Sequence, residues 1–295
     1  MMYSMRFRDP LTIEETASYL ARLSGGEPRR DLLCLAETDS TNRLLLQMAA
    51  DGAPDGQVVI ADCQTAGRGR LGRSFASPAG YGLYFSYLFR TGGNRSRLSS
   101  GEAAQGTPAD EVSPLLLTAH TAVAVSDAIE AVCGIRPGIK WVNDLLLPER
   151  ADGRMRKVCG ILAQAVTAED SRLSGIVVGI GINVHEDVTD FPAELQEIAG
   201  SLFTATGRHA ARAQLAAALV RSMDALRGLS REEAATLLTR YRAHSLMPGK
   251  AITVIRGEIS QAATALAIED DFALRVRFAD GTEESLRSGD VSVRF

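Results

Sequence analysis

The feature of this 295-residue chain that most constrains its fold is an uninterrupted apolar run, SGIVVGIGINV, at residues 174–184. The run carries no charged residue, so a strand built from it has no face suited to water. It therefore predicts a fully buried strand in the centre of a sheet. Upstream, residues 31–38, 40–52 and 56–66 have the patterns of a strand, a helix and a strand. This β-α-β opening predicts that the fold class is α/β.

The remaining core elements follow from the same periodicities. Apolar positions at helical spacing predict helices near 12–23, 113–133, 210–226 and 231–244. Alternating patterns predict strands at 81–89, 138–148 and 157–167, the last two adjacent in a hairpin. The first helix ends at Gly25-Gly26 and is too short to form a helix-turn-helix domain.

The character of the chain changes after Met247-Pro248-Gly249. Five short strand patterns with an Asp280-Gly281 turn predict a small barrel from residues 251–257, 264–270, 273–280, 282–288 and 291–295. We therefore expect an N-terminal extension at 1–30, a large domain at 31–247 and a small domain at 248–295. A polar stretch rich in Gly and Ser at 91–113 predicts a solvated loop, whose role the sequence leaves open.

Composition argues against several classes of protein. The chain is 45% hydrophobic, enough for a sizeable core, and its net charge of −4 gives no general basic surface for nucleic acid. The four cysteines contain no C-x-x-C pair, which argues against a zinc site or a disulfide framework. The longest apolar stretches, such as 115–125, fall short of the roughly 20 residues of a membrane span. With no secretory signal at the start, we expect a cytoplasmic protein.

The most informative motif is the glycine-arginine loop, which we define as residues 64–73, QTAGRGRLGR. Its glycines fit the G-x-G-x-x-G pattern of dinucleotide-binding folds, but residues 74–78 follow as SFASP instead of a helix that would face a pyrophosphate. Its three arginines, Arg68, Arg70 and Arg73, suit a phosphate or carboxylate ligand. A basic surface turn has the same composition, so the loop alone does not decide between the two.

Two polar clusters are further candidates. Residues 39–42, DSTN, are either a helix cap provided by Asp39 or Ser40, or part of a site. Residues 140–144, KWVND, place Lys140, the only tryptophan, an amide and a carboxylate at one turn. There Asp144 can hold a magnesium ion or fix a lysine, and Lys140 can contact phosphate. A charged hairpin end would have the same composition.

Residues on two predicted strands can likewise be either structural or part of a site. Lys157 opens an apolar strand, so its side chain either reaches outward to solvent or is held in a site. Gly179 and Gly181 lack bulk near the end of the central strand, which allows a flat ring to approach the backbone or allows close packing. Asn183 follows them with a donor and an acceptor.

Taken together and in order, DSTN, Q-x-AGRGR-x-GR, KW-x-ND, K-x-x-GIL and G-x-GIN resemble the biotin protein ligases, across roughly residues 31–295. The resemblance is to the monofunctional type without an N-terminal winged helix. It implies a mixed-sheet catalytic domain at 31–247, of the biotin and lipoate ligase type, and an SH3-like β-barrel at 248–295. Five ordered motifs are more specific than any one of them.

The resemblance also implies an activity. The enzyme would use ATP and Mg²⁺ to convert biotin to biotinyl-5′-AMP and would then transfer biotin to a lysine of a biotin carboxyl carrier protein. It implies a possible homodimer, no nucleic-acid partner and no membrane partner. One alternative is a lipoate or octanoate ligase of the same fold, although those families lack the GRGR-x-GR loop. The other is a biotin-responsive DNA-binding regulator, against which the acidity and the missing winged helix argue.

Site residues are implied by matching motif positions. The biotin-binding residues implied are Ser40, Thr41, Asn42, Gln64, Arg68, Gly69, Arg70 and Lys157. The nucleotide-binding residues implied are Arg68, Arg70, Lys140, Trp141, Asn143 and Asn183. The catalytic residues implied are Lys157, Arg70, Lys140 and Asp144, with Asp144 as the magnesium ligand.

The chain departs from its relatives in three places. Val142 stands where many relatives have proline, and Cys159 where a small alanine is common. Residues 186–201 contain no tryptophan, although some relatives place one over the adenine in this segment. Phe191 and Leu195 are the candidates to replace it.

Overall fold

A computed structural model describes residues 9, 11–23, 32–91, 113–168, 172–287 and 290–293. Most of the loop predicted at 91–113 lies outside the described residues, as does the predicted helix end at Gly25-Gly26.

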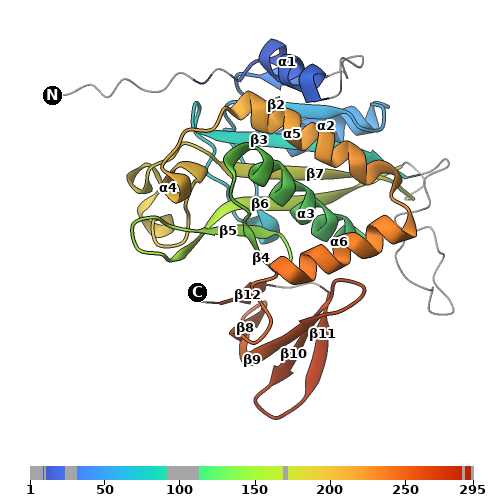
Figure 1. The fold of residues 1–295 in the computed structure, drawn as a ribbon. Coiled ribbons are helices and arrows are strands. Elements are labelled where there is room, and N and C mark those ends of the chain that lie inside the picture. Colours follow the sequence, from blue (N-terminus) through green and yellow to red (C-terminus); the bar gives the residue numbers. More distant parts are fainter. Residues whose placement is uncertain are drawn as a thin grey trace.

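Seven strands form a mixed sheet in the order β1-β2-β3-β7-β6-β5-β4 (Figure 1). Their bounds are β1 Leu32–Leu35, β2 Val58–Ala61, β3 Gly82–Arg90, β4 Gly138–Lys140, β5 Asp144–Pro148, β6 Met155–Thr167 and β7 Leu173–Asn183. Strands β1 and β2 pair in parallel, and the other neighbours pair antiparallel. Strand β7 lies between β3 and β6, which confirms the central strand predicted from the apolar run.

Helices bury both faces of this sheet. Ile176 and Val178 of β7 belong to the core cluster shared with α3 and α5, and Val177 between them belongs to the cluster under α2. The strand therefore has no wet face, which explains its apolar sequence. The α-helices are α1 Ile13–Leu23, α2 Thr41–Ala50, α3 Pro114–Cys133, α4 Leu202–Thr206, α5 Arg212–Ala225 and α6 Arg231–His244. Short 3₁₀ turns are η1 Arg70–Gly72, η2 Val188–Asp190, η3 Ala193–Leu195 and η4 Leu226–Gly228.

Helix α3 corrects one expectation. The sequence suggested that its apolar stretch falls short of a membrane span, but the helix has 20 residues and is long and apolar enough to pass that test. Within this protein 72% of its most apolar window is buried. It packs against α5, α6 and β6, as the core helix of a folded domain does, and such helices meet the same criteria of length and composition.

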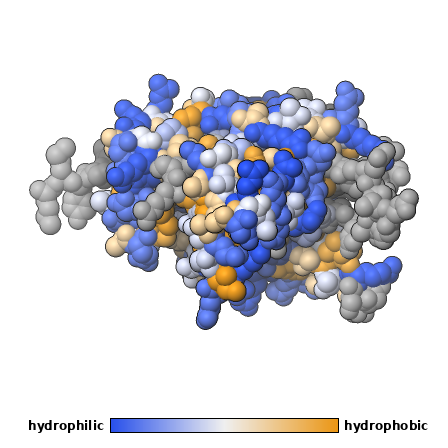
Figure 2. All heavy atoms as spheres, turned by 90° about the horizontal axis from the view of Figure 1, so that it is seen from below, coloured by the Kyte–Doolittle hydropathy of each residue, from blue (hydrophilic) through white to orange (hydrophobic). Residues whose placement is uncertain are grey.

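The C-terminal segment forms a second, antiparallel sheet in the order β11-β10-β9-β8-β12. Its strands are β8 Ala251–Arg256, β9 Ile259–Ile268, β10 Leu274–Phe278, β11 Glu283–Leu286 and β12 Asp290–Ser292. Gly281 has φ 87° between β10 and β11, which confirms the predicted turn. The sheet is consistent with an SH3-like barrel, whereas the domain limits at 31 and 248 stay predictions. Viewed from below, this end of the molecule is largely hydrophilic, with apolar residues in small separate groups (Figure 2).

One predicted strand is wrong in its extent. Residues 138–148 are not a single strand beside 157–167, because residues 141–143 turn the chain. The segment splits into β4 and β5, which pair with each other, and only β5 pairs with β6. This turn carries the KWVND cluster to the end of a hairpin.

The central strand sets the stability of the large sheet. Ile176 in β7 is fully buried, so Ile176→Ala removes buried methyl groups and leaves a cavity. We expect the free energy of unfolding to fall by about 2–5 kcal/mol. Ile259→Ala is the matched control, because Ile259 is 64% exposed, and should change it by less than about 0.5 kcal/mol. Denaturant unfolding followed by circular dichroism measures both, and equal losses would show that β7 is not a packed centre.

Candidate active site

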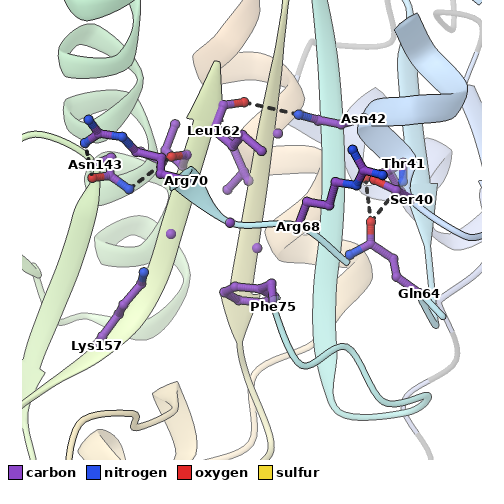
Figure 3. Close-up of a pocket in the computed structure, with 16 residues that line it drawn as sticks. Ser40, Thr41, Asn42, Gln64, Arg68, Arg70, Phe75, Asn143, Lys157 and Leu162 are labelled. Atoms are coloured by element: carbon purple, nitrogen blue, oxygen red, sulfur yellow. Dashed lines mark hydrogen bonds between the residues drawn. The ribbon is translucent and has the colours of Figure 1, made fainter. Parts of the chain in front are cut away.

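A pocket lies where the N-terminus of α2 and the glycine-arginine loop face strands β6 and β7 (Figure 3). Nine residues predicted for the site line it together: Ser40, Thr41, Asn42, Gln64, Arg68, Gly69, Arg70, Asn143 and Lys157. Gly179 and Gly181, which the sequence offered as a place for a flat ring, also line it, and the structure adds Phe75, Gly160, Ile161, Leu162 and Ile180. Motifs that lie far apart in the sequence thus share one cavity.

One end of the pocket is lined by hydroxyl and amide groups, with the Arg68 side chain beside them (Figure 3). Ser40 is the N-cap of α2, so the DSTN motif is both a cap and part of the lining. The Oε1 atom of Gln64 accepts from the backbone N–H of Thr41 at 2.9 Å and from its hydroxyl at 3.1 Å. Ser86 Oγ lies 2.8 Å from Thr41 Oγ1 and 2.6 Å from Asn42 Oδ1. These mutual hydrogen bonds fix the donors and acceptors before a ligand arrives.

Glycines form the floor of the pocket. A Cβ atom on Gly181 would come within 2.6 Å of the Phe75 ring, and one on Gly179 would overlap the amide of Asn42. Neither position has room for a side chain, so both readings of the glycine pair hold: they permit close packing, and they line the cavity. Sequence reasoning missed Phe75, whose only signal was its place directly after the glycine-arginine loop.

The glycine-arginine loop is a tight turn and does not lead into a helix. Gly69 N–H donates to the Arg73 carbonyl at 2.7 Å, and η1 occupies the tip. Residue 67 must be glycine, because a Cβ there would lie 2.5 Å from the Phe75 carbonyl oxygen. Leu71 at the tip has φ 56° and is 69% exposed. Because no helix N-terminus follows, the dinucleotide-binding interpretation fails on geometry as well.

The opposite end of the pocket is cationic. Arg70 Nη1 donates to Asn143 Oδ1 at 2.9 Å, and Asn143 Nδ2 donates to Asp144 Oδ1 at 3.0 Å. Lys157 Nζ lies 2.7 Å from the same carboxylate oxygen. Asp144 therefore fixes a lysine in this structure, which is one of the two roles that its sequence context allowed. The turn between β4 and β5 links the loop to the lysine through these contacts.

The local electrostatics favour an anionic ligand. Burial lowers the pKa of the Arg70 guanidinium and of the Lys140 amine, and the carboxylate of Asp144 opposes both shifts. Lys157 and Arg73 repel the charge on Lys140 and lower its pKa further. Four cations thus act on a region that Asp144 only partly neutralises, and an anion that enters it relieves their mutual repulsion.

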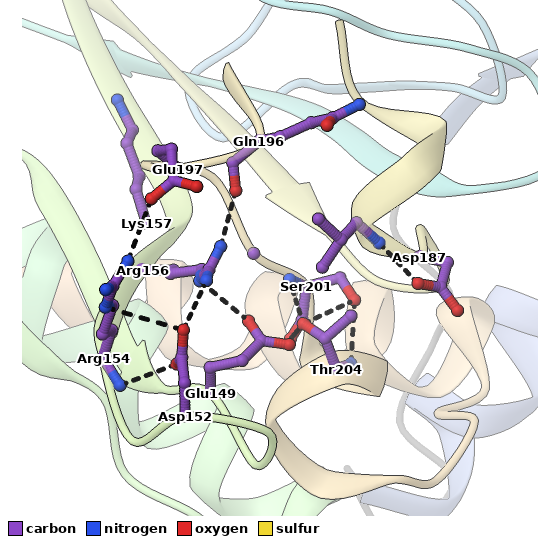
Figure 4. A network of polar contacts seen from close by, with 12 residues as sticks. Glu149, Asp152, Arg154, Arg156, Lys157, Asp187, Gln196, Glu197, Ser201 and Thr204 are labelled. Atoms are coloured by element: carbon purple, nitrogen blue, oxygen red, sulfur yellow. Dashed lines mark hydrogen bonds and ion pairs between the residues drawn. The ribbon is translucent and has the colours of Figure 1, made fainter. Parts of the chain in front are cut away.

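A network of polar contacts holds residues 196–201 beside Lys157 (Figure 4). The backbone N–H of Lys157 donates to the Ile198 carbonyl at 2.8 Å, and the Lys157 carbonyl accepts from the N–H of Gly200 at 2.9 Å. Arg156 is buried next to Glu149, with Nε 3.3 Å from its carboxylate, and donates to the Gln196 carbonyl at 2.5 Å. The segment therefore continues the sheet next to the lysine.

The structure places four predicted nucleotide or catalytic residues outside the lining. Lys140 and Asp144 lie just behind it, in electrostatic contact with Lys157. Trp141 and Asn183 lie outside it as well. Trp141 is buried and its indole N–H donates to the Phe272 carbonyl at 2.8 Å, and Asn183 donates to the Gly200 carbonyl at 2.9 Å. The indole N–H of Trp141 and the amide N–H of Asn183 are thus bonded within the protein, and the nucleotide-binding role of both residues stays a prediction. Neither Phe191 nor Leu195 is in the lining described by the structure.

Comparison with known proteins identifies the family. Residues 34–183 match the model of the Biotin/lipoate A/B protein ligase family. The chain is 33% identical over 253 residues to the biotin–[acetyl-CoA-carboxylase] ligase of Mycobacterium tuberculosis, covering 84% of this chain and 83% of that protein. It is 39% identical over 174 residues to the bifunctional ligase/repressor BirA of Bacillus spizizenii, covering 59% of this chain and 46% of that protein. The match thus spans about half the length of the Bacillus relative.

Structural comparison agrees. The fold superposes on the biotin protein ligase of Aquifex aeolicus in complex with biotin and ATP with a TM-score of 0.69 and 25% identity, over 90% of this chain and 99% of that one. The chain belongs to the biotin/lipoate A/B protein ligase family.

A buried carboxyl group near the site gives a testable pH dependence. Glu186 follows β7, and burial raises the pKa of its carboxyl to about 7, with the charge of Asp190 adding to the shift. Neighbouring backbone N–H groups oppose the shift, yet neither carboxyl oxygen has a partner at hydrogen-bond geometry within the described residues. An unfolded glutamate ionises near 4.5, so the folded state binds the proton more tightly.

Ionisation of Glu186 therefore costs native stability as the pH rises between these two values. From about pH 5 to about pH 8, we expect the free energy of unfolding of the wild type to fall by about 2–3 kcal/mol relative to that of Glu186→Gln. Denaturant titrations at both pH values measure the difference. Glu194→Gln, at an exposed glutamate, is the control and should follow the wild type. Parallel curves for wild type and Glu186→Gln would contradict the assignment.

Proposed function

We propose that this chain is a biotin protein ligase. It joins biotin to the adenylyl group of ATP to give biotinyl-5′-AMP, and it then transfers biotin to a lysine of a biotin carboxyl carrier protein. The observation that carries the proposal is the distribution of polar groups in the pocket. Hydroxyl and amide groups around Thr41 and Gln64 lie across a glycine floor from the cations Arg70 and Lys157. Biotin has the same arrangement, with a neutral ureido ring at one end and a carboxylate at the other.

The end with the hydroxyl and amide groups suits the ureido group. Each unmatched donor or acceptor of a buried ureido ring would cost about 1–3 kcal/mol, and the pocket offers hydroxyl and amide groups already held in place. The missing side chains at Gly179 and Gly181 let a flat ring approach the strand. We assign Ser40, Thr41, Asn42 and Gln64 to this end of biotin.

The cationic end suits the first reaction. An oxygen of the biotin carboxylate attacks the α-phosphorus of ATP, and the bond to pyrophosphate breaks, so two anions must be brought together. In this proposal Lys157 and Arg70 neutralise the carboxylate and the α-phosphate, while Lys140 neutralises the departing pyrophosphate. Asp144 holds Lys157 in position at 2.7 Å.

The donor set near Asp144 fits a magnesium ion bound together with substrate. Magnesium is commonly held by one or two carboxylates plus phosphate oxygens and water. Among the described residues no group of three His, Cys, Asp or Glu side chains surrounds a metal site, so ATP would supply most of the other ligands. When bound, the ion supplies positive charge to the phosphates. The residues that would hold it are Asp144 and, through its amide oxygen, Asn143.

In the second reaction the amine of an acceptor lysine attacks the carbonyl carbon of biotinyl-AMP, an amide forms and AMP leaves. The mixed anhydride is destroyed by water, so the glycine-arginine loop must cover it until the acceptor arrives. Arg68 and Arg70 lie on that loop and line the pocket.

We further propose that the chain works in the cytoplasm and forms a homodimer through an edge of the large sheet. The compartment is supported by the four free cysteines, which suit a reducing environment, and by the use of ATP. Strands β1 and β4 form the two edges of the sheet.

The decisive experiment incubates the full chain with ATP, Mg²⁺, biotin and a biotin carboxyl carrier domain. Mass spectrometry should show one biotinyl group on the carrier, and ATP should be consumed only when biotin is present. A parallel reaction with lipoate or octanoate and a lipoyl carrier domain tests the alternative within the family. Failure to consume ATP in the presence of biotin would refute the proposal.

Lys157 gives the sharpest single-residue prediction. We expect Lys157→Ala to reduce biotin-dependent ATP–pyrophosphate exchange by about 10²–10³-fold, because it removes a charge next to the developing negative charge. Folding should survive, because the side chain is 36% exposed. Lys250→Ala is the matched control, since Lys250 is the one lysine of the chain outside this region. Normal exchange by Lys157→Ala would remove this residue from the mechanism.

Arg70 should control retention of the intermediate. In Arg70→Ala the loop loses its bond to Asn143 and a charged contact with the phosphate, each of the kind worth about 1.5–3 kcal/mol. We expect biotinyl-AMP to leave the enzyme about 10–100-fold faster, measured by filter retention of labelled intermediate. Arg221→Ala, at an exposed position on α5, should retain it as the wild type does. An unchanged half-life in Arg70→Ala would contradict the role of the loop.

A further inference from the structure

The second sheet inserts one side chain into the large domain. Phe272 lies in the turn between β9 and β10, and its side chain is fully buried. Its ring makes edge contacts with His120 of α3, at 5.3 Å between centroids, and with Tyr241 of α6, at 5.2 Å. Phe272 has φ 63°, a conformation that bulky residues rarely adopt. The surroundings must therefore hold the residue in this conformation.

The same residue contacts the turn that carries the KWVND cluster. The indole N–H of Trp141 donates to the Phe272 carbonyl oxygen at 2.8 Å, and both groups are buried. Tyr241, whose ring packs on Phe272, places its hydroxyl 3.5 Å from the carbonyl oxygen of Val142. Phe272 thus contacts Trp141 directly and Val142 through Tyr241 of α6.

The next two residues of that turn hold the cationic end of the pocket. Asn143 accepts from Arg70 at 2.9 Å, and Asp144 pairs with Lys157 at 2.7 Å. The Tyr241 hydroxyl is also close enough to Arg70 and Asp144 for their charges to act on it. A continuous series of contacts therefore runs from Phe272 through residues 141–144 to the two cations.

We propose that Phe272 is a positioning residue for the active site. Through Trp141 and Tyr241 it sets the place of residues 141–144, and so the positions of Arg70 and Lys157 toward the reacting anions. This inference rests on the proposed function. The second sheet then contributes to adenylate formation without touching a substrate, because small displacements of charged groups weaken catalysis strongly.

The junction is not arranged for stability alone. Both ring nitrogens of His120 are buried beside Phe272 without a hydrogen-bond partner among the described residues. Burial lowers the pKa of His120 to about 4, so the ring is neutral near neutral pH. An apolar side chain in place of His120 would avoid the cost of burying unpaired polar atoms.

The test uses the chain's only tryptophan as a reporter, because Trp141 lies at the junction itself. We expect Phe272→Ala to lower kcat of biotin-dependent pyrophosphate exchange at least 10-fold, with KM for biotin changed less than twofold. Leu286→Ala is the matched control, because it removes a buried side chain of β11 opposite Leu274 while leaving the ring contacts of Phe272 with His120 and Tyr241 in place. At equal or greater loss of Tm, it should keep kcat within twofold of the wild type.

Fluorescence separates positioning from general loosening. In the wild type and in Leu286→Ala, addition of ATP and biotin should change the emission of Trp141. In Phe272→Ala the emission should lie further to the red and should no longer respond to the ligands. Phe272→Leu, which keeps a large apolar side chain at this position, should restore part of kcat.

Phe272→Ala could fail to fold, so a second variant that keeps the Phe272 side chain is also tested. Trp141→Phe removes the indole N–H together with part of the ring, leaves Phe272 in place and should lower kcat in the same direction. Wild-type kcat in both Phe272→Ala and Trp141→Phe, or losses that track Tm equally in Phe272→Ala and Leu286→Ala, would overturn the proposal. If the wild type shows no exchange, the proposed function fails. In that case the emission of Trp141 is measured on addition of ATP alone. A change in the wild type that is absent in Phe272→Ala would support the coupling between the junction and the pocket, and no change in the wild type would refute it.

Discussion

The site depends on the crowding of like charges around one carboxylate. Arg70, Lys140 and Lys157 are brought together near Asp144, and burial disfavours the charged forms of the first two. Such a cluster of cations costs free energy when no anion is bound, so other contacts of the fold must hold these side chains together. It does so with the hairpin of β4 and β5, the backbone of β6 and the residues paired beside Lys157. An anionic ligand at this place would relieve the repulsion between the cations.

The elements that burial dictates were predictable from sequence. The central strand β7 and helices α3, α5 and α6 follow directly from apolar periodicity, because their side chains meet a core on every buried face. The split of residues 138–148 was not predictable in the same way. The turn at 141–143 lacks glycine and proline and is itself largely buried, so the apolar pattern continues through it.

The site was predictable where a motif carries its own chemistry. Lys157 and two of the three loop arginines, Arg68 and Arg70, do line the pocket. Phe75 and Ser86 were missed, because their roles arise only from packing against Gly181 and Asn42. The internal hydrogen bond of Trp141 was not predictable for the same reason: its partner, Phe272, is 131 residues away in the turn between β9 and β10.

The glycines Gly179 and Gly181 on the floor of the pocket restrict which residues can occupy the central strand. Glycine inside a strand weakens it by roughly 0.5–1 kcal/mol relative to alanine, and β7 carries such residues at the heart of the domain. The strand tolerates them because β3 and β6 pair with it on both sides. A residue of higher strand propensity at Gly179 or Gly181 would collide with Asn42 or Phe75, so the groups that shape the cavity also keep glycine in the strand.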